Sequence, residues 1–226
     1  CRDEHALYAL VKAIDWKRHF APSRTLRVDV AATRSPLPSL EFATLRVKDA
    51  VFDRLRDDTG TRPSVDKRAP DVRVAAYLTE RDATIYVDTS GEPLFKRGWR
   101  RDAEEAPLRE NLAAGLIALT GWAPGTPFFD PMCGSGTIAI EAALIAAGRA
   151  PGLARTFGFQ KLAWFDGPAW QRMKQAARDR ERAAPAAPAI FASDAAGGAV
   201  GKTLANLRAA KLDGFVAVEQ ADFLAR

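Results

Sequence analysis

The sequence predicts an α/β protein in which a small N-terminal module precedes a parallel sheet with helical crossovers. Two observations lead to this prediction. Before residue 90, runs of alternating apolar residues mark short strands around one long helix, whereas after residue 126 strand and helix patterns alternate. The segment between them is rich in glycine, proline and charge. We therefore expect one domain in 1–90, a linker in 91–107 and a second domain in 108–226.

The N-terminal module is expected to contain a strand, a helix and a hairpin. "RTLRVDVAAT" alternates apolar residues with the period of a half-buried strand. "SLEFATLRVKDAVFDRLRDDTG" predicts a helix that Ser39 caps and Gly60 ends. "DVRVAAYLT" and "ATIYVD", separated by the turn "ERD", predict a hairpin. The expected apolar face of the helix is formed by Phe42, Leu45, Phe52 and Leu55.

The second domain is expected to open with a helix. Pro107 is well suited to the first helical position of "PLRENLAAGLIALTGW", and Gly121 ends this segment. Leucines recur through it at helical spacing, at Leu108, Leu112, Leu116 and Leu119.

A strand, "PFFD", then leads through a glycine turn to the helix "GTIAIEAALIAAG", which is apolar nearly all round and should be buried. After a long interruption that ends in "RDRERAAPAAP" come a strand "AIFASD", a helix "AGGAVGKTLANLRAAKLDG" and a strand "FVAVEQAD". This alternation predicts a parallel, doubly wound sheet.

Composition places the chain among globular proteins, because 47% of its 226 residues are hydrophobic. Two cysteines and two histidines exclude a disulfide scaffold and leave no Cys/His zinc cluster, so we expect no metal and a reducing, cytoplasmic setting. No apolar run approaches the roughly 20 residues of a membrane span, and we expect no membrane partner. The net charge of +5 permits a nucleic-acid partner. The first residue is Cys1 rather than Met, so we expect a fragment.

The stretch "DPMCGSGT" holds the strongest candidate site. It connects the strand "PFFD" to the apolar helix, and ligands of open α/β sheets bind beyond the carboxyl ends of the strands. Gly134 and Gly136 can adopt backbone angles closed to other residues and can let a ligand approach the main chain. The following helix start presents free N–H groups. The alternative is a tight turn without a ligand, but a plain turn needs fewer special residues.

Two other classes of nucleotide ligand fit the sequence poorly. Gly134, Gly136 and Ala139 match the dinucleotide pattern G-x-G-x-x-A, but that fold also needs an acidic residue about 20 positions later, where Thr156 stands in a segment unlike a strand. A triphosphate loop is suggested by "GGAVGKT", which is one residue short of G-x-x-x-x-G-K-[ST]. A helix start with Lys202 on its solvated face is the simpler interpretation of that segment.

The third ligand class, S-adenosylmethionine, agrees better with the acidic residues. Asp130 ends the first strand and suits the ammonium of the methionine tail, and Asp194 ends the second strand and can accept both ribose hydroxyls. Asp222 follows the third strand and can accept from the adenine amino group. Each aspartate alone could be a helix cap or a solvated strand end. All three at successive strand ends favour the methyl donor.

These motifs resemble a family of RNA methyltransferases that carry a THUMP RNA-binding domain, in particular the bacterial large-subunit ribosomal RNA guanine-N2 methyltransferases. The resemblance runs through "KDAVFDRLRDDTGTRPSVD", "DTSGEPLFKRGWR", "EAPLRENLAAGLIALTGW", "DPMCGSGTIAIEAA" and "APGLARTFGFQKLAWFD", which together span almost the whole chain. It implies a THUMP-like module followed by the first half of a Rossmann-like class I methyltransferase sheet. It also implies transfer of a methyl group to a guanine N2 amine in ribosomal RNA.

The resemblance implies specific contacts to the methyl donor. Asp194 would bind its ribose and Asp222 its adenine, and Asn111 would belong to the same pocket. The remaining donor contacts would be Asp130, Cys133, Gly134, Ser135 and Gly136.

The sequence departs from the family in two respects. The catalytic Asn/Asp-Pro-Pro-aromatic stretch, which holds the target amine and stacks on the flipped base, does not occur in the 226 residues. We therefore expect no catalytic residue and no activity from this chain alone. In "SDAAGGAV", a further acidic residue that the family often has two positions after the first is missing.

The segment "FKRGWRRD" is the candidate RNA contact, because cations bind phosphates and aromatic rings stack on bases. Its candidate residues are Lys96, Arg97, Trp99, Arg100 and Arg101. The alternative is a solvated linker whose tryptophan packs between domains. A non-catalytic RNA-binding module is the alternative function, and a nicotinamide-linked dehydrogenase is a more distant one.

Overall fold

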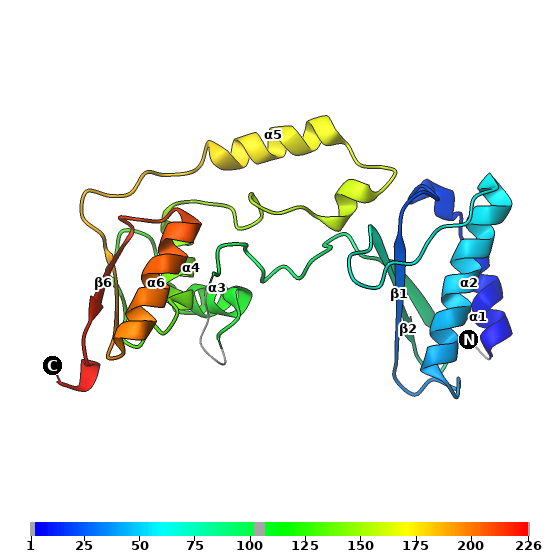
Figure 1. Ribbon diagram of the computed structural model, residues 1–226, viewed down its shortest axis with the longest axis horizontal. Coiled ribbons are helices and arrows are strands. Elements are labelled where there is room, and N and C mark those ends of the chain that lie inside the picture. The colour runs from blue at the N-terminus through cyan, green and yellow to red at the C-terminus, as the bar shows by residue number, and fades with distance from the viewer. Residues whose placement is uncertain (1–2, 102–106, 226) are drawn as a thin grey trace. The chain divides into compact units, whose positions relative to one another are not determined.

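The computed structural model describes residues 3–101 and 107–225 (Figure 1). The chain forms two compact units. The first contains the residues up to Glu92 together with Thr156–Gly167, and the second contains Pro93–Arg155 and the residues from Pro168 onward. Each unit is described by itself.

The first unit is built on a three-stranded sheet in the order β1-β2-β3, with β1 at Leu26–Ala32, β2 at Val72–Leu78 and β3 at Ala83–Val87. β1 and β2 are parallel, and β2 and β3 form the predicted antiparallel hairpin. Val74 and Ala76 of β2 point into the core, which confirms the alternation in the sequence.

Two helices, α1 (Glu4–Lys12) and α2 (Leu40–Thr59), pack side by side in the first unit (Figure 1). The predicted ends of α2 are confirmed, since the Ser39 hydroxyl accepts a hydrogen bond from the Phe42 N–H at 3.2 Å and Gly60 has a φ of 73°. The buried face differs from the predicted one, because Phe42 and Leu45 are exposed. The residues that α2 buries are Ala43, Val47, Ala50, Val51, Phe52 and Leu55.

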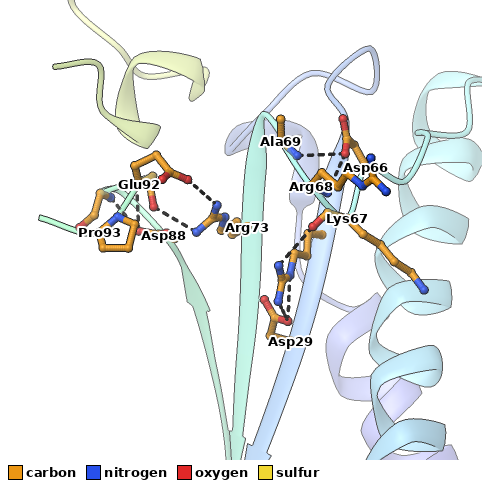
Figure 2. Close-up of polar contacts among 12 residues, drawn as sticks. Asp29, Asp66, Lys67, Arg68, Ala69, Arg73, Asp88, Glu92 and Pro93 are labelled. Carbon is orange, nitrogen blue, oxygen red and sulfur yellow. Dashed lines mark hydrogen bonds and ion pairs between the residues drawn. The ribbon is translucent and has the colours of Figure 1, made fainter. Parts of the chain in front are cut away.

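The segment after β3 is held to the sheet by Arg73 of β2. Its guanidinium donates to the Gly91 carbonyl and to the Glu92 carboxylate, each at 3.2 Å, and Figure 2 shows Arg73 reaching this segment from the sheet. The Asp88 carboxylate accepts the Ser90 N–H at 2.7 Å and shapes the turn that follows the strand. These bonds keep the first residues of the predicted linker in the first unit.

Residues 156–167 return to the first unit although they lie between two helices of the second. They contain the 3₁₀ helix η2 (Gly158–Lys161). The Phe159 N–H donates to the Thr89 carbonyl at 2.9 Å and the Ala163 N–H to the His19 carbonyl at 2.7 Å. Leu162 is buried in the core of the first unit. The sequence did not predict this packing.

The second unit contains three parallel strands in the order β4-β5-β6, at Phe128–Asp130, Ile190–Asp194 and Val216–Gln220. The crossover helices α4 (Thr137–Ala146) and α6 (Gly197–Ala210) contact each other and therefore cover one face of this sheet. α4 is buried nearly all round, as its composition predicted. Phe129 and Phe191, paired in the sheet, are half exposed.

Two further helices complete the second unit. α3 (Glu110–Leu119) begins three residues after the expected Pro107, and Gly121 follows its end with a φ of 69°. It buries Ala113 and Ile117, while its leucines at 112, 116 and 119 are exposed. α5 (Gly167–Arg178) ends at the first residue of "RDRERAAPAAP", a stretch whose charges are typical of a helix end, and none of its residues is buried. Two 3₁₀ turns, η1 (Trp16–Arg18) and η3 (Phe223–Ala225), complete the described elements.

The packing of residues 156–167 on the first unit leads to a stability prediction. Leu162→Ala should lower the free energy of opening of that unit by about 2–5 kcal/mol, because it removes a buried leucine and leaves a cavity. Hydrogen exchange of the β2 amides measures this. Leu10→Ala, at an exposed position of α1, is the matched control and should change exchange little. Equal protection in the two variants would contradict the assignment of this segment to the first unit.

Candidate functional site

The glycine loop, residues 131–136, connects β4 to α4 and contains the two conformationally demanding positions of the site. Gly134 and Gly136 have φ angles of 55° and 82°, in the left-handed region that favours glycine. A Cβ atom on Gly136 would lie 2.8 Å from Cγ2 of Thr203 on α6. The loop therefore needs glycine at position 136 both for its backbone angle and for its approach to α6.

Helix α6 holds the glycine loop through two buried side chains. The Thr203 hydroxyl donates to the Gly134 carbonyl at 2.9 Å, and the Asn206 amide donates to the Ser135 carbonyl at 3.0 Å. Both side chains are fully buried. The sequence analysis missed these residues. The sequence does contain an indication of their role, because Thr203 and Asn206 are polar residues three positions apart that share one face of an otherwise apolar helix.

Cys133 and Ser135 turn their side chains into the protein. The Cys133 sulfur lies 3.5 Å from the Thr203 hydroxyl, and burial raises the pKa of this thiol. The Ser135 hydroxyl accepts a hydrogen bond from Nη1 of Arg100 at 3.1 Å. At the outer side of the loop, Cys133 and Ser135 therefore present backbone atoms rather than side chains. Their contact with a methyl donor stays a prediction.

Asp130 ends β4 and is only 8% exposed. Its carboxylate accepts hydrogen bonds from the backbone N–H groups of Met132 and Ala139, so it links the strand end to the loop and to the first turn of α4. Burial raises the pKa of Asp130, the two N–H groups oppose the shift, and the nearby Asp194 charge adds to it.

The other two predicted aspartates lie at the same edge of the sheet, because the three strands are parallel: Asp194 is the last residue of β5, and Asp222 follows β6. The Asp194 carboxylate accepts the Gly134 N–H at 3.0 Å and the Ala196 N–H at 2.9 Å. It therefore fixes the outer part of the glycine loop against β5. The Asp222 carboxylate accepts the Leu224 N–H at 2.9 Å, which matches the capping role considered as its alternative.

Asn111 lies in the first turn of α3 and is exposed. In the described part of the chain no hydrogen bond joins it to the glycine loop. Its assignment to the donor pocket is therefore not supported by a contact and stays a prediction.

Three of the five candidate RNA contacts face inward. Trp99 is only 5% exposed and packs in the core of the second unit. Arg97 forms an ion pair with the buried Glu141 at 3.3 Å, and Arg100 forms one with the buried Glu110 at 2.9 Å. The structure engages these three side chains in internal contacts, and their contact with RNA stays a prediction.

Arg100 also forms hydrogen bonds that hold together the segments around the glycine loop. Besides Glu110 and Ser135 it donates to the Thr137 hydroxyl at 2.9 Å and to the Leu108 carbonyl at 3.1 Å. It thereby ties the start of α3 to the start of α4.

Burial raises the pKa of Glu141, and the Arg97 guanidinium opposes this shift.

The two remaining candidates, Lys96 and Arg101, are exposed. The Arg101 backbone N–H donates to the Asn206 side-chain oxygen at 2.8 Å, which links this segment to the same α6 residue that holds the loop. RNA contact by Lys96 and Arg101 stays a prediction. Residues 102–106, in the expected linker, lie outside the described residues.

The site therefore combines a glycine loop held by α6 with the carboxylates of Asp130 and Asp194, which accept hydrogen bonds from the loop backbone. Met132, the second residue of the loop, is 77% exposed, so this part of the loop faces solvent. Within residues 3–101 and 107–225, no group of three or more His, Cys, Asp or Glu side chains could hold a metal ion. In those same residues, no helix has the length and apolar character of a bilayer-spanning segment.

The contact between Gly136 and Thr203 predicts an order of stabilities. Gly136→Ala should destabilise the second unit more than Gly121→Ala, although both place alanine at a positive φ, because only the former meets a neighbouring atom. The positive φ costs about 1–2 kcal/mol in each variant, and overpacking adds about 1–3 kcal/mol at position 136. Urea unfolding measures both values.

A double-mutant cycle isolates the contact. Adding Thr203→Ala to Gly136→Ala should cost less than the sum of the two single changes, because the shortened side chain makes room for the new Cβ. Strict additivity of the two changes would show that Thr203 does not restrict the loop.

Comparison with known proteins agrees with this arrangement. Residues 97–225 match the family model described as the RMKL-like methyltransferase domain, and residues 1–88 match the THUMP domain. The ribosomal RNA large subunit methyltransferase K/L of Magnetococcus marinus is 41% identical over an alignment of 227 positions, which covers 97% of this chain and 31% of that protein. The chain thus spans about a third of the curated relatives it matches.

Solved structures are similar over both units. SMU.472, solved in complex with SAH, is 30% identical with a TM-score of 0.87, and the match covers 98% of this chain and 58% of that one. A Listeria monocytogenes protein described as a predicted N6-adenine-specific DNA methylase is 29% identical, with a TM-score of 0.86 and the same coverage.

These matches confirm the predicted THUMP-like module and Rossmann-like methyltransferase sheet. One family model alone covers more than half of the sequence. The chain therefore belongs to the family of RMKL-like methyltransferase domains, with a THUMP domain preceding that domain.

Proposed function

We propose that this protein methylates large-subunit ribosomal RNA with S-adenosylmethionine, and that the target atom is the N2 amine of a guanine. The observation that carries the proposal is the glycine loop at the end of β4, whose backbone N–H groups donate to the carboxylates of Asp130 and Asp194. The K/L methyltransferase of Magnetococcus marinus and SMU.472 with its bound SAH support the reaction and the donor. The guanine amine rests on the family resemblance.

The residues of the site fit the chemical groups of the donor. A carboxylate at position 130 complements an ammonium, and a carboxylate at position 194 has lone pairs for ribose hydroxyls in addition to the two N–H groups it accepts. Gly134 adds no side chain to the loop, so a ligand can approach the backbone there, whereas the missing Cβ of Gly136 makes room for Thr203. Asp222 is proposed to accept from the adenine amine.

The contribution of this chain to catalysis would be positioning. S-adenosylmethionine, when bound, supplies a methyl group on a cationic sulfonium. The chain would hold the amino-acid tail with Asp130 and the ribose with Asp194 on a loop that α6 keeps rigid. Such fixed placement of reactants can account for a large share of a rate acceleration. The THUMP domain is proposed to bind the RNA.

Donor binding is the direct test. Asp194→Ala should weaken the affinity for S-adenosylmethionine about 10- to 100-fold, because it removes charge-assisted hydrogen bonds worth about 1.5–3 kcal/mol. Isothermal titration calorimetry on the chain measures this. Asp213→Ala removes an exposed carboxylate from the loop before β6 and should bind the donor like the wild type. A wild type that does not bind, or an Asp194→Ala variant that binds equally well, would refute the proposed pocket.

The pH dependence of donor binding should report on Asp130. Its pKa lies above the ordinary value of 3.8 because the carboxylate is buried. Only the ionised form attracts the donor ammonium, so affinity should fall as the pH is lowered through this raised pKa, earlier than for an exposed aspartate. Asp130→Asn should bind more weakly at neutral pH and show a flatter profile. Identical pH profiles for the two proteins would remove Asp130 from the site.

A further inference from the structure

A cavity of the second unit, of about 360 Å³, lies at the far end of α4 from the glycine loop. The ten residues of α4 separate the two sites by about 15 Å. Its wall is largely apolar and includes Leu144, Pro151 and Leu153. Its size lies within the range of ligand sites in proteins. None of the donor-site residues named above lines it.

The charged side chains of this cavity are mostly cationic. Four cations, Arg97, Arg149, Arg178 and Lys211, line it together with one carboxylate, Glu181. A cavity of about 530 Å³ in the first unit differs in this respect, since its cations and carboxylates are equal in number. Those residues are Arg24, Arg73 and Lys161 with Asp71, Asp88 and Glu92. The cavity of the second unit thus has an excess of positive charge that this cavity of the first unit lacks.

Two of the four cations are already engaged. Arg97 is paired with Glu141, and Arg149 with Glu181 at 3.1 Å. Arg149 also donates to the carbonyls of Ala210 and Lys211, which carry the partial negative charge of the C-terminal end of α6. Arg149 therefore neutralises the helix end and fixes the shape of the cavity.

Arg178 and Lys211 remain available at the cavity. Both are exposed, and among the described residues neither forms an ion pair. Lys211 is also held in place, because it caps α6 with a φ of 55° and its N–H bonds to the Arg208 carbonyl at 3.0 Å. The indole N–H of Trp99, a residue of the cavity wall, is buried without an acceptor in the described part of the chain.

We infer that this cavity binds the phosphate backbone of the substrate RNA, through Arg178 and Lys211, at a distance from the methylated base. The inference rests on the proposed function, which makes RNA the polyanion that this protein meets. Two cations without carboxylate partners at one opening complement adjacent phosphates, and the apolar wall provides a surface against which a nucleoside can pack. Such a contact would orient the RNA without reading its sequence.

The test compares two variants that remove the same number of charges from the same two helical segments. Arg178→Gln with Lys211→Asn removes the proposed contacts, and asparagine tolerates the left-handed backbone at position 211. The control, Arg172→Gln with Arg208→Gln, changes exposed residues of α5 and α6 that do not line the cavity. Fluorescence anisotropy with a labelled RNA stem–loop, at several salt concentrations, measures the affinity.

The cavity variant should bind the RNA about tenfold more weakly, and its salt slope should decrease by about 1 for each phosphate that the protein no longer neutralises. The control should bind like the wild type. The inference is overturned if the cavity variant keeps wild-type affinity for the RNA, or if both variants lose affinity equally. It is also overturned if the wild type binds ATP at this cavity but does not bind the RNA. SAH calorimetry on the same samples separates the two proposals. Absent SAH binding counts against the donor site alone, and unchanged SAH affinity in the cavity variant shows that it is folded.

Discussion

The close approach of the glycine loop to α6 is the contact on which the site depends. Gly136 packs against Thr203, and the carbonyls of Gly134 and Ser135 accept hydrogen bonds from Thr203 and Asn206. With its inner side fixed in this way, the loop also binds Asp194 through the Gly134 N–H. One steric constraint thus connects the ends of β4 and β5 and brings the carboxylates of Asp130 and Asp194 close enough for their charges to interact.

In the second unit, some charged side chains form buried ion pairs and others lie at the surface. Arg97 and Arg100 lie beside Glu141 and Glu110, where desolvation makes an unpaired charge costly. Their role is to connect the segment before α3 with α3 and α4. Cations without such partners, Arg178 and Lys211, lie at helix ends instead. Density of positive charge in the sequence therefore does not show which cations are free of a carboxylate partner, because ion pairing is decided by the tertiary structure.

The two units are not consecutive along the sequence. Residues 156–167 belong to the first unit, where Leu162 is buried, although α4 precedes them and α5 follows them. Their anchors are backbone hydrogen bonds to Thr89 and His19. Gly158 permits this packing, because a Cβ atom there would lie 2.8 Å from the Asp88 carbonyl oxygen. The first unit therefore requires residues from both halves of the sequence.

Local patterns in the sequence determined most elements and the position of the loop. The strands, the caps of α2 at Ser39 and Gly60, the buried α4 and the three aspartates at successive strand ends all follow from spacing over a few residues. Only the tertiary structure decided which side chains face inward. It exposed the leucines of α3, buried Trp99, and placed Thr203 and Asn206 beneath the loop. The physical reason is that burial and ion pairing arise between segments far apart in the chain, where periodicity within one segment carries no information about its partner.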